Sequence, residues 1–323
     1  MPGEPGLPRN ELESIHPVVH HSDQVARVLV REIVMSDTFQ TISVTPVGSA
    51  LGAEIEGVDI AAGVSDGQFQ EIYRAFSEHG VIFFRNQELT PDQHLEFAAR
   101  WGDINVNRFF RPTQENPRIA EVLKEPHQQK NIGEDWHTDH SYDQVPAMGS
   151  ILYAKEVPPV GGDTLFASTC AAFEGLSEGL QTMLLSMRAE HSSRHAFGAS
   201  YHATANQEDL DGRYRNAEQA TQDASHPVVI AHPLSGRPSL YVNGGFTVKF
   251  EGWSVEESRP LLEYLYNHMI RAEYVYRFQW NRGDIAIWDN RATLHMATND
   301  YHGYRRLMHR VTVEGVELLP WTH

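Results

Sequence analysis

Cysteine is almost absent from this chain: Cys170 is the only one among 323 residues, so no internal disulfide can form. Proteins without disulfides are typical of a reducing compartment, and we therefore expect a cytoplasmic location. The sequence also lacks a long apolar run, because charged residues interrupt every stretch that approaches the roughly 20 residues of a membrane span. No basic region followed by an apolar stretch opens the chain, so we expect neither a secretory signal nor a membrane partner.

Basic residues are scarce as well. The chain carries 26 Lys and Arg against 43 Asp and Glu, which gives a formal net charge of −17. A protein that binds nucleic acid needs a basic stripe that neutralises phosphates, and none is visible in this sequence. The composition therefore argues against a nucleic-acid partner, while it leaves open whether the chain forms a homo-oligomer.

Residues 1–38 differ in composition from the rest of the chain. They begin rich in proline and glycine, continue through a histidine cluster at residues 16–21, and end in a short amphipathic stretch near residues 25–33. Such a segment buries too little apolar surface to fold alone, so we expect a flexible N-terminal extension. The remaining residues, 39–323, are expected to form the functional domain, and they are long enough for a substantial core.

Helices are predicted by capping boxes, in which a Ser or Thr and a Glu or Gln three residues later satisfy each other's backbone N–H groups. The sequence has three of these pairs, at Ser65/Gln68, Thr90/Gln93 and Ser254/Glu257. Gly80 and Gly102 are expected to end the first two helices. A further helical pattern covers about residues 170–187, with weak spots at Gly175 and Gly179.

Short strands are expected over much of the rest of the chain. The sequence predicts a buried strand at 81–84, a hairpin from 228–230 and 239–242, and strands at 274–280, 285–288 and 307–313. A turn at residues 281–284 separates two of these strands. Many short strands accompanied by a few helices predict an α+β fold, and the pattern suits a jelly-roll barrel buttressed by helices.

The tripeptide His137-Thr138-Asp139 is the most informative motif. On an extended strand, side chains at i and i+2 point to the same face, so His137 and Asp139 could reach one metal ion. His295, far downstream, would complete two imidazoles and one carboxylate on one face of an octahedron. That ligand set is typical of non-heme Fe(II) sites that activate oxygen, although a His-x-Asp tripeptide alone is a weak signal among 18 histidines.

Two arginines near the C-terminus predict anionic ligands. Arg306 and Arg310 share one face of a strand with Met308, because strand side chains alternate. Two guanidinium groups that point into the interior of a barrel are costly unless anions pair with them. A guanidinium fork suits bidentate binding of a carboxylate. Arg305, on the other face, is expected to be an ordinary exposed cation.

The spacing of these elements resembles a known family. Trp136 precedes the tripeptide, a Gly-Gly-Asp-Thr-Leu turn follows at residues 161–165, and Arg306 lies eleven residues after His295. From about Thr41 to about Thr312 the chain resembles the taurine dioxygenase (TauD/TfdA) family of Fe(II)- and α-ketoglutarate-dependent dioxygenases. The resemblance implies that residues 39–323 form a double-stranded β-helix (jelly-roll) barrel buttressed by helices.

The resemblance also implies an activity and a set of site residues. It implies that Fe(II) is held by His137, Asp139 and His295, and that 2-oxoglutarate (α-ketoglutarate) is bound by Thr164 and Arg306. The implied reaction consumes O2, hydroxylates a small molecule and releases succinate and CO2. Since halogenating relatives lack the carboxylate ligand, the presence of Asp139 favours oxygen transfer over halogenation.

The substrate is expected to be an anion with an apolar body, a carboxylate or a sulfonate. Arg310 matches the position that grips the sulfonate in taurine dioxygenase, although it could instead support the co-substrate. Asn107 and Phe110 stand where that enzyme has a histidine and a tyrosine, so taurine itself is not expected. Two aromatic residues match the family's pocket lining, with core packing as the alternative, and one histidine follows Asp139 at the cavity wall: Phe197, Phe246 and His140.

Two other interpretations compete with the dioxygenase. A zinc-dependent hydrolase could use the same two imidazoles and carboxylate, but it would leave Arg306 and Thr164 without a role and would show no oxygen uptake with 2-oxoglutarate. A non-catalytic metal-binding barrel would be favoured if a ligand were missing, and all three are present.

Overall fold

The computed structural model describes residues 38–210 and 212–322. The expectations for the N-terminal extension, including its histidine cluster, fall outside the described residues. The described residues from Phe39 onward form one compact unit of mixed helices and strands. Within residues 38–210 and 212–322, no helix has the length and apolarity to span a membrane.

The larger sheet has eight strands in the order β1-β2-β3-β14-β6-β16-β4, and β5 also pairs with β16. Its pairs are antiparallel apart from β2 and β3. The strands are β1 (Ser43–Pro46), β2 (Ala53–Glu56), β3 (Val81–Phe84), β4 (Ile104–Asn105), β5 (Ala120–Lys124), β6 (Gly149–Glu156), β14 (Ile285–Asp289) and β16 (Arg306–Val313).

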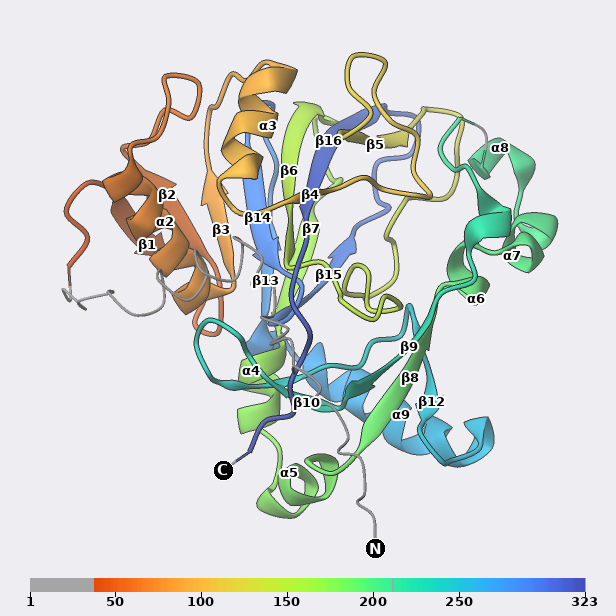
Figure 1. Ribbon diagram of the computed structural model, residues 1–323. Helices are drawn as coiled ribbons and strands as arrows, with labels where there is room; N and C mark the ends of the chain where they lie inside the picture. The colour runs from red at the N-terminus through yellow and green to blue at the C-terminus, as the bar shows by residue number, and fades with distance from the viewer. Residues whose placement is uncertain (1–37, 211, 323) are drawn as a thin grey trace, which may run out of the picture. The chain divides into compact units, whose positions relative to one another are not determined.

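The central strands of this sheet are buried on both faces. In β3, Ile82 and Phe84 join one apolar cluster, while Val81 and Phe83 join another on the opposite face. This explains why the strand reads as a continuous apolar run, as the sequence predicted. The helices α2 (Asp66–His79) and α3 (Pro91–Ala99) cover the first of these faces (Figure 1).

The helix starts that the sequence predicted from neighbouring residues are confirmed. The capping boxes of α2, α3 and α9 (Val255–Met269) are all formed. Gly80 ends α2 with φ at 71°, a left-handed conformation that glycine adopts without strain. The helix α3 ends at Ala99, three residues before Gly102.

A three-stranded antiparallel sheet faces the larger one. Its order is β13-β7-β15, with β7 (Thr164–Ser168) between β13 (Val275–Phe278) and β15 (Thr293–Ala297). Phe166 and Phe278 from this sheet pack with Phe83 of the larger sheet. The predicted turn at residues 281–284 carries the chain from β13 in one sheet to β14 in the other.

The long helix predicted at residues 170–187 is two helices, α4 (Thr169–Glu174) and α5 (Glu178–Leu184). The break falls at Gly175, one of the two predicted weak spots. A side chain there would place its Cβ 1.9 Å from the hydroxyl of Tyr274, so Tyr274 packs closely against this break and would have to shift for any larger residue. Apolar side chains of α4 and α9 form a further cluster with Ala167 and Leu294 of the three-stranded sheet.

The remaining elements lie largely between residues 188 and 250, and the sequence predicted only the hairpin among them. That hairpin is formed by β10 (Val229–Ala231) and β11 (Pro238–Leu240). The others are β8 (Arg188–Ser192), α6 (Arg194–Phe197), α7 (Ala199–Thr204), α8 (Gln207–Leu210), β9 (Asp223–Pro227) and β12 (Thr247–Phe250), with 3₁₀ turns η1 (Ala217–Gln219) and η2 (Ala272–Tyr274).

Candidate metal centre and cavity

Two segments far apart in the sequence meet at the metal-binding motif. His137 forms an isolated antiparallel bridge with His295, which lies in the middle of β15. Their backbones exchange two hydrogen bonds, from His137 N–H to His295 O at 3.1 Å and from His295 N–H to His137 O at 2.8 Å. This bridge brings the two imidazole rings to a centroid distance of 4.2 Å.

The prediction that residues 137–139 form an extended strand is wrong for Asp139. Only His137 pairs with another strand, whereas Asp139 lies in a turn. His140 follows in the same turn with φ at 61°, a left-handed backbone conformation. The two side chains nonetheless approach the same point, as the motif predicted.

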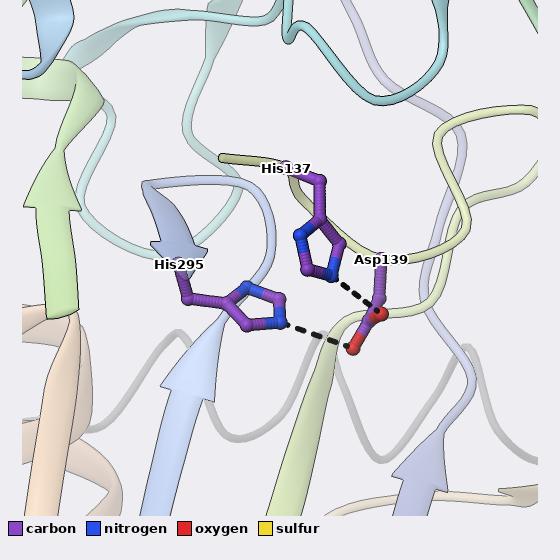
Figure 2. A group of neighbouring side chains, drawn as sticks. All are labelled: His137, Asp139 and His295. Carbon is purple, nitrogen blue, oxygen red and sulfur yellow. Dashed lines mark ion pairs between the residues drawn. The ribbon is translucent and has the colours of Figure 1, made fainter. Parts of the chain in front are cut away.

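The donor atoms of the three residues face one another, as Figure 2 shows. All lie within 4.8 Å of each other, with His137 Nε2 3.7 Å and His295 Nε2 3.8 Å from the nearer oxygens of Asp139. The Nδ1 of His137 lies 2.7 Å from the carbonyl of Asp135, so Nδ1 donates and Nε2 keeps its lone pair for a metal. Two imidazoles and one carboxylate, arranged in this way, fit Fe(II).

The surroundings of Asp139 and His295 favour the protonation states in which these side chains bind a metal. Burial raises the pKa of the Asp139 carboxyl, but Arg310 and the neighbouring imidazoles outweigh burial and hold that pKa well below its usual range. Burial lowers the pKa of His295, and the nearby His137 lowers it further. A carboxylate and a neutral imidazole are the protonation states that ligate metal ions.

The metal centre opens into a cavity of about 290 Å³ that has walls from both sheets. Every residue that the sequence assigned to the site lines this cavity: His137, Asp139, His295, Thr164, Arg306, Arg310, Asn107, Phe110, His140, Phe197 and Phe246. The structure thus brings the whole predicted set together.

Arg306 is a buried cation without a carboxylate partner among the described residues. Its side chain is only 2% exposed, and its Nε donates to the carbonyl of Gly162 at 3.1 Å. Its Nη2 has no hydrogen-bond partner in the described part of the chain, and burial lowers its pKa. The hydroxyl of Thr164, on the same cavity, accepts a hydrogen bond from Trp280 Nε1 at 2.9 Å. This corner of the cavity suits an anion.

Arg310 has a partner that the sequence did not predict. Its Nη1 donates to both carboxylate oxygens of Asp139, at 3.2 and 3.1 Å. The Oγ of Ser150 donates to the same carboxylate at 3.1 Å. The guanidinium also lies over the ring of Phe110 at 4.6 Å, a cation–π contact. Arg310 therefore contacts both the metal ligand Asp139 and the ring of Phe110.

The cavity next to Arg310 is lined by an aromatic wall that consists of Phe110, Tyr142, Phe197 and Phe246. Phe197 lies edge-on to Phe110 at 5.9 Å, and Tyr142 lies edge-on to Phe246 at 4.9 Å. Asn107 shapes the loop beneath, because its Oδ1 accepts the backbone N–H groups of Phe109 at 2.9 Å and Phe110 at 2.8 Å. The wall is apolar and can pack against an apolar ligand.

His140 is fixed beside this wall. Its Nδ1 lies 3.0 Å from the carboxylate of Asp143, which also pairs with Arg108 at 2.6 Å.

Several residues of the cavity carried no sequence signal that we used. These include Asn131, Ile132, Tyr142, His195, Tyr214 and Trp288. Tyr142 lies in a turn, where strand alternation does not apply, so no periodic pattern marks it. Tyr214 lies in a polar segment of short helices, and its bridge to Phe110 arises only through tertiary contact.

Comparisons with known proteins agree with this geometry. A family model described as "Taurine catabolism dioxygenase TauD, TfdA family" matches residues 43–312. An alpha-ketoglutarate-dependent sulfate ester dioxygenase from Pseudomonas putida is 34% identical over 274 residues, which cover 85% of this chain and 90% of the relative. An alpha-ketoglutarate-dependent 2,4-dichlorophenoxyacetate dioxygenase from Cupriavidus pinatubonensis is 32% identical over 294 residues, which cover 84% of this chain and 97% of the relative.

A solved structure supports the same assignment. The crystal structure of a taurine dioxygenase from Burkholderia xenovorans matches with a TM-score of 0.73 and 30% identity, covering 87% of this chain and 93% of that one. The protein is thus an oxidoreductase of the Fe(II)- and 2-oxoglutarate-dependent dioxygenase class, whose reactants are 2-oxoglutarate and O2. Within this class the chain belongs to the TauD/TfdA family. The expected family is confirmed, and neither the zinc hydrolase nor the non-catalytic barrel is favoured.

Proposed function

We propose that this enzyme hydroxylates a small-molecule anion that has an apolar body. The observation that carries the proposal is a single cavity in which the His-Asp-His cluster, two buried guanidinium groups and an aromatic wall meet. When Fe(II) is bound by His137, Asp139 and His295, it supplies oxidative chemistry: one oxygen atom of O2 enters succinate as 2-oxoglutarate loses CO2, and the other enters the substrate.

Arg306 and Thr164 are proposed to bind the distal carboxylate of 2-oxoglutarate. Arg306 brings a buried positive charge that lacks a carboxylate partner in the described residues, and a carboxylate would satisfy its free Nη2. The Thr164 hydroxyl already accepts from Trp280, so its own proton remains available to donate to the ligand. The two groups would thereby orient the co-substrate toward the metal.

The substrate is proposed to place its anionic group near Arg310 and its apolar body against the aromatic wall. Asn107, His140, Phe110, Phe197 and Phe246 would line this part of the cavity. Two relatives are named for sulfate esters and for 2,4-dichlorophenoxyacetate, both of which carry an acidic group on a larger body. Taurine is not expected as the substrate, because Asn107 and Phe110 replace the polar groups that the resemblance assigns to sulfonate binding.

Further proposals concern the whole chain. The two facing sheets, antiparallel apart from β2 and β3, support a double-stranded β-helix barrel within a dioxygenase domain at residues 39–323. The lone Cys170 supports a cytoplasmic location.

A succinate-release screen tests the proposed function. Purified enzyme with Fe(II) and 2-oxoglutarate is offered a panel of alkyl and aryl carboxylates, sulfonates and sulfate esters, with taurine included, and the products are analysed by mass spectrometry. We expect an apolar-bodied anion to give the fastest succinate release together with a product that has gained one oxygen atom or has been cleaved. Faster turnover with taurine than with every other member would refute the proposed substrate class.

The two arginines are separated by the kinetics of their variants. Arg306→Ala should raise the KM for 2-oxoglutarate by about tenfold or more, since a hydrogen bond to a charged group contributes about 1.5–3 kcal/mol. Since Arg310 also pairs with Asp139, Arg310→Ala is assayed at saturating Fe(II), where it should act mainly on the KM for the prime substrate. If both variants affect only the co-substrate, the assignment of Arg310 is wrong.

A further inference from the structure

The middle residue of the metal-binding tripeptide, Thr138, makes a contact that the motif does not explain. The flanking residues His137 and Asp139 line the cavity, whereas the hydroxyl of Thr138 donates to the backbone carbonyl of Asn290 at 2.5 Å. Thr138 is 2% exposed and Asn290 is 1% exposed, so water does not compete for this bond.

The acceptor of this bond is itself held firmly. Asn290 lies in the short turn between β14 and β15, and β15 carries His295. Its backbone N–H donates to Met148 O at 2.9 Å, and its Oδ1 accepts from Trp288 Nε1 at 2.9 Å. The carbonyl that receives the Thr138 hydroxyl is therefore fixed relative to the start of the strand that bears His295.

We propose that Thr138 is a positioning residue that fixes Asp139 relative to His295. Backbone hydrogen bonds join the two ligand segments at Gly133 with Ala297 and at His137 with His295. Asp139 follows in a turn without strand pairing, and its carboxylate is bound by Arg310 and Ser150. The backbone bonds to β15 end at His137, and the bond from Thr138 to Asn290 extends the attachment to the residue directly before Asp139. This inference rests on the proposed metal role of His137, Asp139 and His295.

The same turn supplies a matched control. Ser239 of β11 donates its Oγ to the carbonyl of Arg291, the residue after Asn290, at 2.8 Å. Ser239 and Arg291 are both buried, but Ser239 belongs to no ligand-bearing segment. Ser239→Ala and Thr138→Ala thus each delete a buried hydroxyl bond to the same turn, and only the second touches the metal ligands.

The experiment measures binding of Mn(II) alone to metal-free protein by electron paramagnetic resonance, together with melting temperatures with and without Mn(II). Thr138→Ala should raise the Kd for Mn(II) by about tenfold or more, as loss of groups that orient metal ligands typically does. The rise in melting temperature on adding Mn(II) should shrink accordingly. Thr138→Ser keeps the hydroxyl and should restore a Kd within about threefold of the wild type.

The control separates positioning from stability. Ser239→Ala should lower the melting temperature of the metal-free protein and leave the Kd for Mn(II) unchanged. If Thr138→Ala does not fold, Thr138→Cys takes its place, since a thiol fills the site but is a weak donor, and the same loss is expected. A Kd equal to that of the wild type in the alanine or cysteine variant overturns the inference. Absence of Mn(II) binding by the wild type would instead overturn the proposed metal site, and this inference with it.

Discussion

Arg305, Arg306 and Arg310 lie within six residues of one another and have three different environments. Arg305 pairs with Glu125 and Glu156 and keeps a third of its side chain exposed. Arg310 pairs with Asp139, whereas Arg306 has no carboxylate partner in the described residues. The period of two along a strand sends Arg306 and Arg310 inward, and the uncompensated charge of Arg306 marks where an anion is expected to bind.

The charge of Arg306 should lower the stability of the ligand-free enzyme. We expect Arg306→Met to raise the free energy of unfolding by about 1–3 kcal/mol, because an apolar side chain of similar length removes an unpaired buried charge. The same variant should lose 2-oxoglutarate binding. Urea denaturation without 2-oxoglutarate measures the effect, with Arg305→Met as a control that should change stability by less than about 1 kcal/mol. A destabilised Arg306→Met protein would show that another group compensates this charge.

At the level of single residues, the sequence predicted which side chains meet but not all of their partners. The inward arginines follow from strand alternation, which is a local property, whereas the ligand set with the distant His295 was implied by the resemblance to the family. The ion pair between Arg310 and Asp139 joins residues 171 positions apart, and Asp139 lies in a turn rather than on a strand. No local pattern contains this information.

Among the elements, β6 and β14 connect the metal centre to the core. β6 begins at Gly149, which pairs with Asp289 of β14 and precedes Ser150, a hydrogen-bond donor to Asp139. A Cβ at Gly149 would lie 2.4 Å from the backbone carbonyl of Trp288, which cannot move without disturbing the sheet. The close approach of these strands therefore requires glycine.

Gly149→Ala should consequently destabilise the protein by about 1–3 kcal/mol through overpacking. The matched variant Gly67→Ala, in α2, meets no atom within 4 Å and should stabilise the helix by about 0.5–1 kcal/mol. Chemical denaturation of both variants measures the two effects. Equal stability of Gly149→Ala and the wild type would contradict the tight pairing of β6 with β14.

The elements also show why some boundaries could be predicted and others could not. Capping boxes act within four residues, so the starts of α2, α3 and α9 follow from the sequence. The split between α4 and α5 falls at Gly175, where Tyr274, about a hundred residues away, packs closely, and the sequence could only mark Gly175 as a weak spot. The short helices α6–α8 have too few residues for a clear period.

For the whole molecule, buried histidines predict a loss of stability in acid. Burial lowers the pKa of His94 to about 3, far below the roughly 6.5 of an unfolded chain. The unfolded state therefore binds more protons than the folded state below pH 6.5, so this contribution is complete above that pH and shrinks as pH falls toward 3. Burial also lowers the pKa of His226 and of His309 to about 4.

Replacing His94 measures its contribution to the loss of stability in acid. When the pH falls from 7 to 5, the free energy of unfolding of His94→Leu should fall by about 2 kcal/mol less than that of the wild type. In the wild type, each pH unit below 6.5 removes about 1.4 kcal/mol, because the unfolded state binds a proton that the folded state does not bind. Urea denaturation of metal-free protein at both pH values provides the comparison, and equal slopes for His94→Leu and the wild type would show that His94 does not remain neutral in the folded state.

The central claim is that one Fe(II) ion binds between His137, Asp139 and His295 with 2-oxoglutarate beside it. Anaerobic titration of metal-free protein with Fe(II), followed by 2-oxoglutarate, tests this claim most directly. We predict a visible charge-transfer absorption that requires both additions and saturates at one iron per chain, and that His295→Ala abolishes. A folded wild-type protein that develops no such absorption, or a His295→Ala variant that retains it, would contradict the claim.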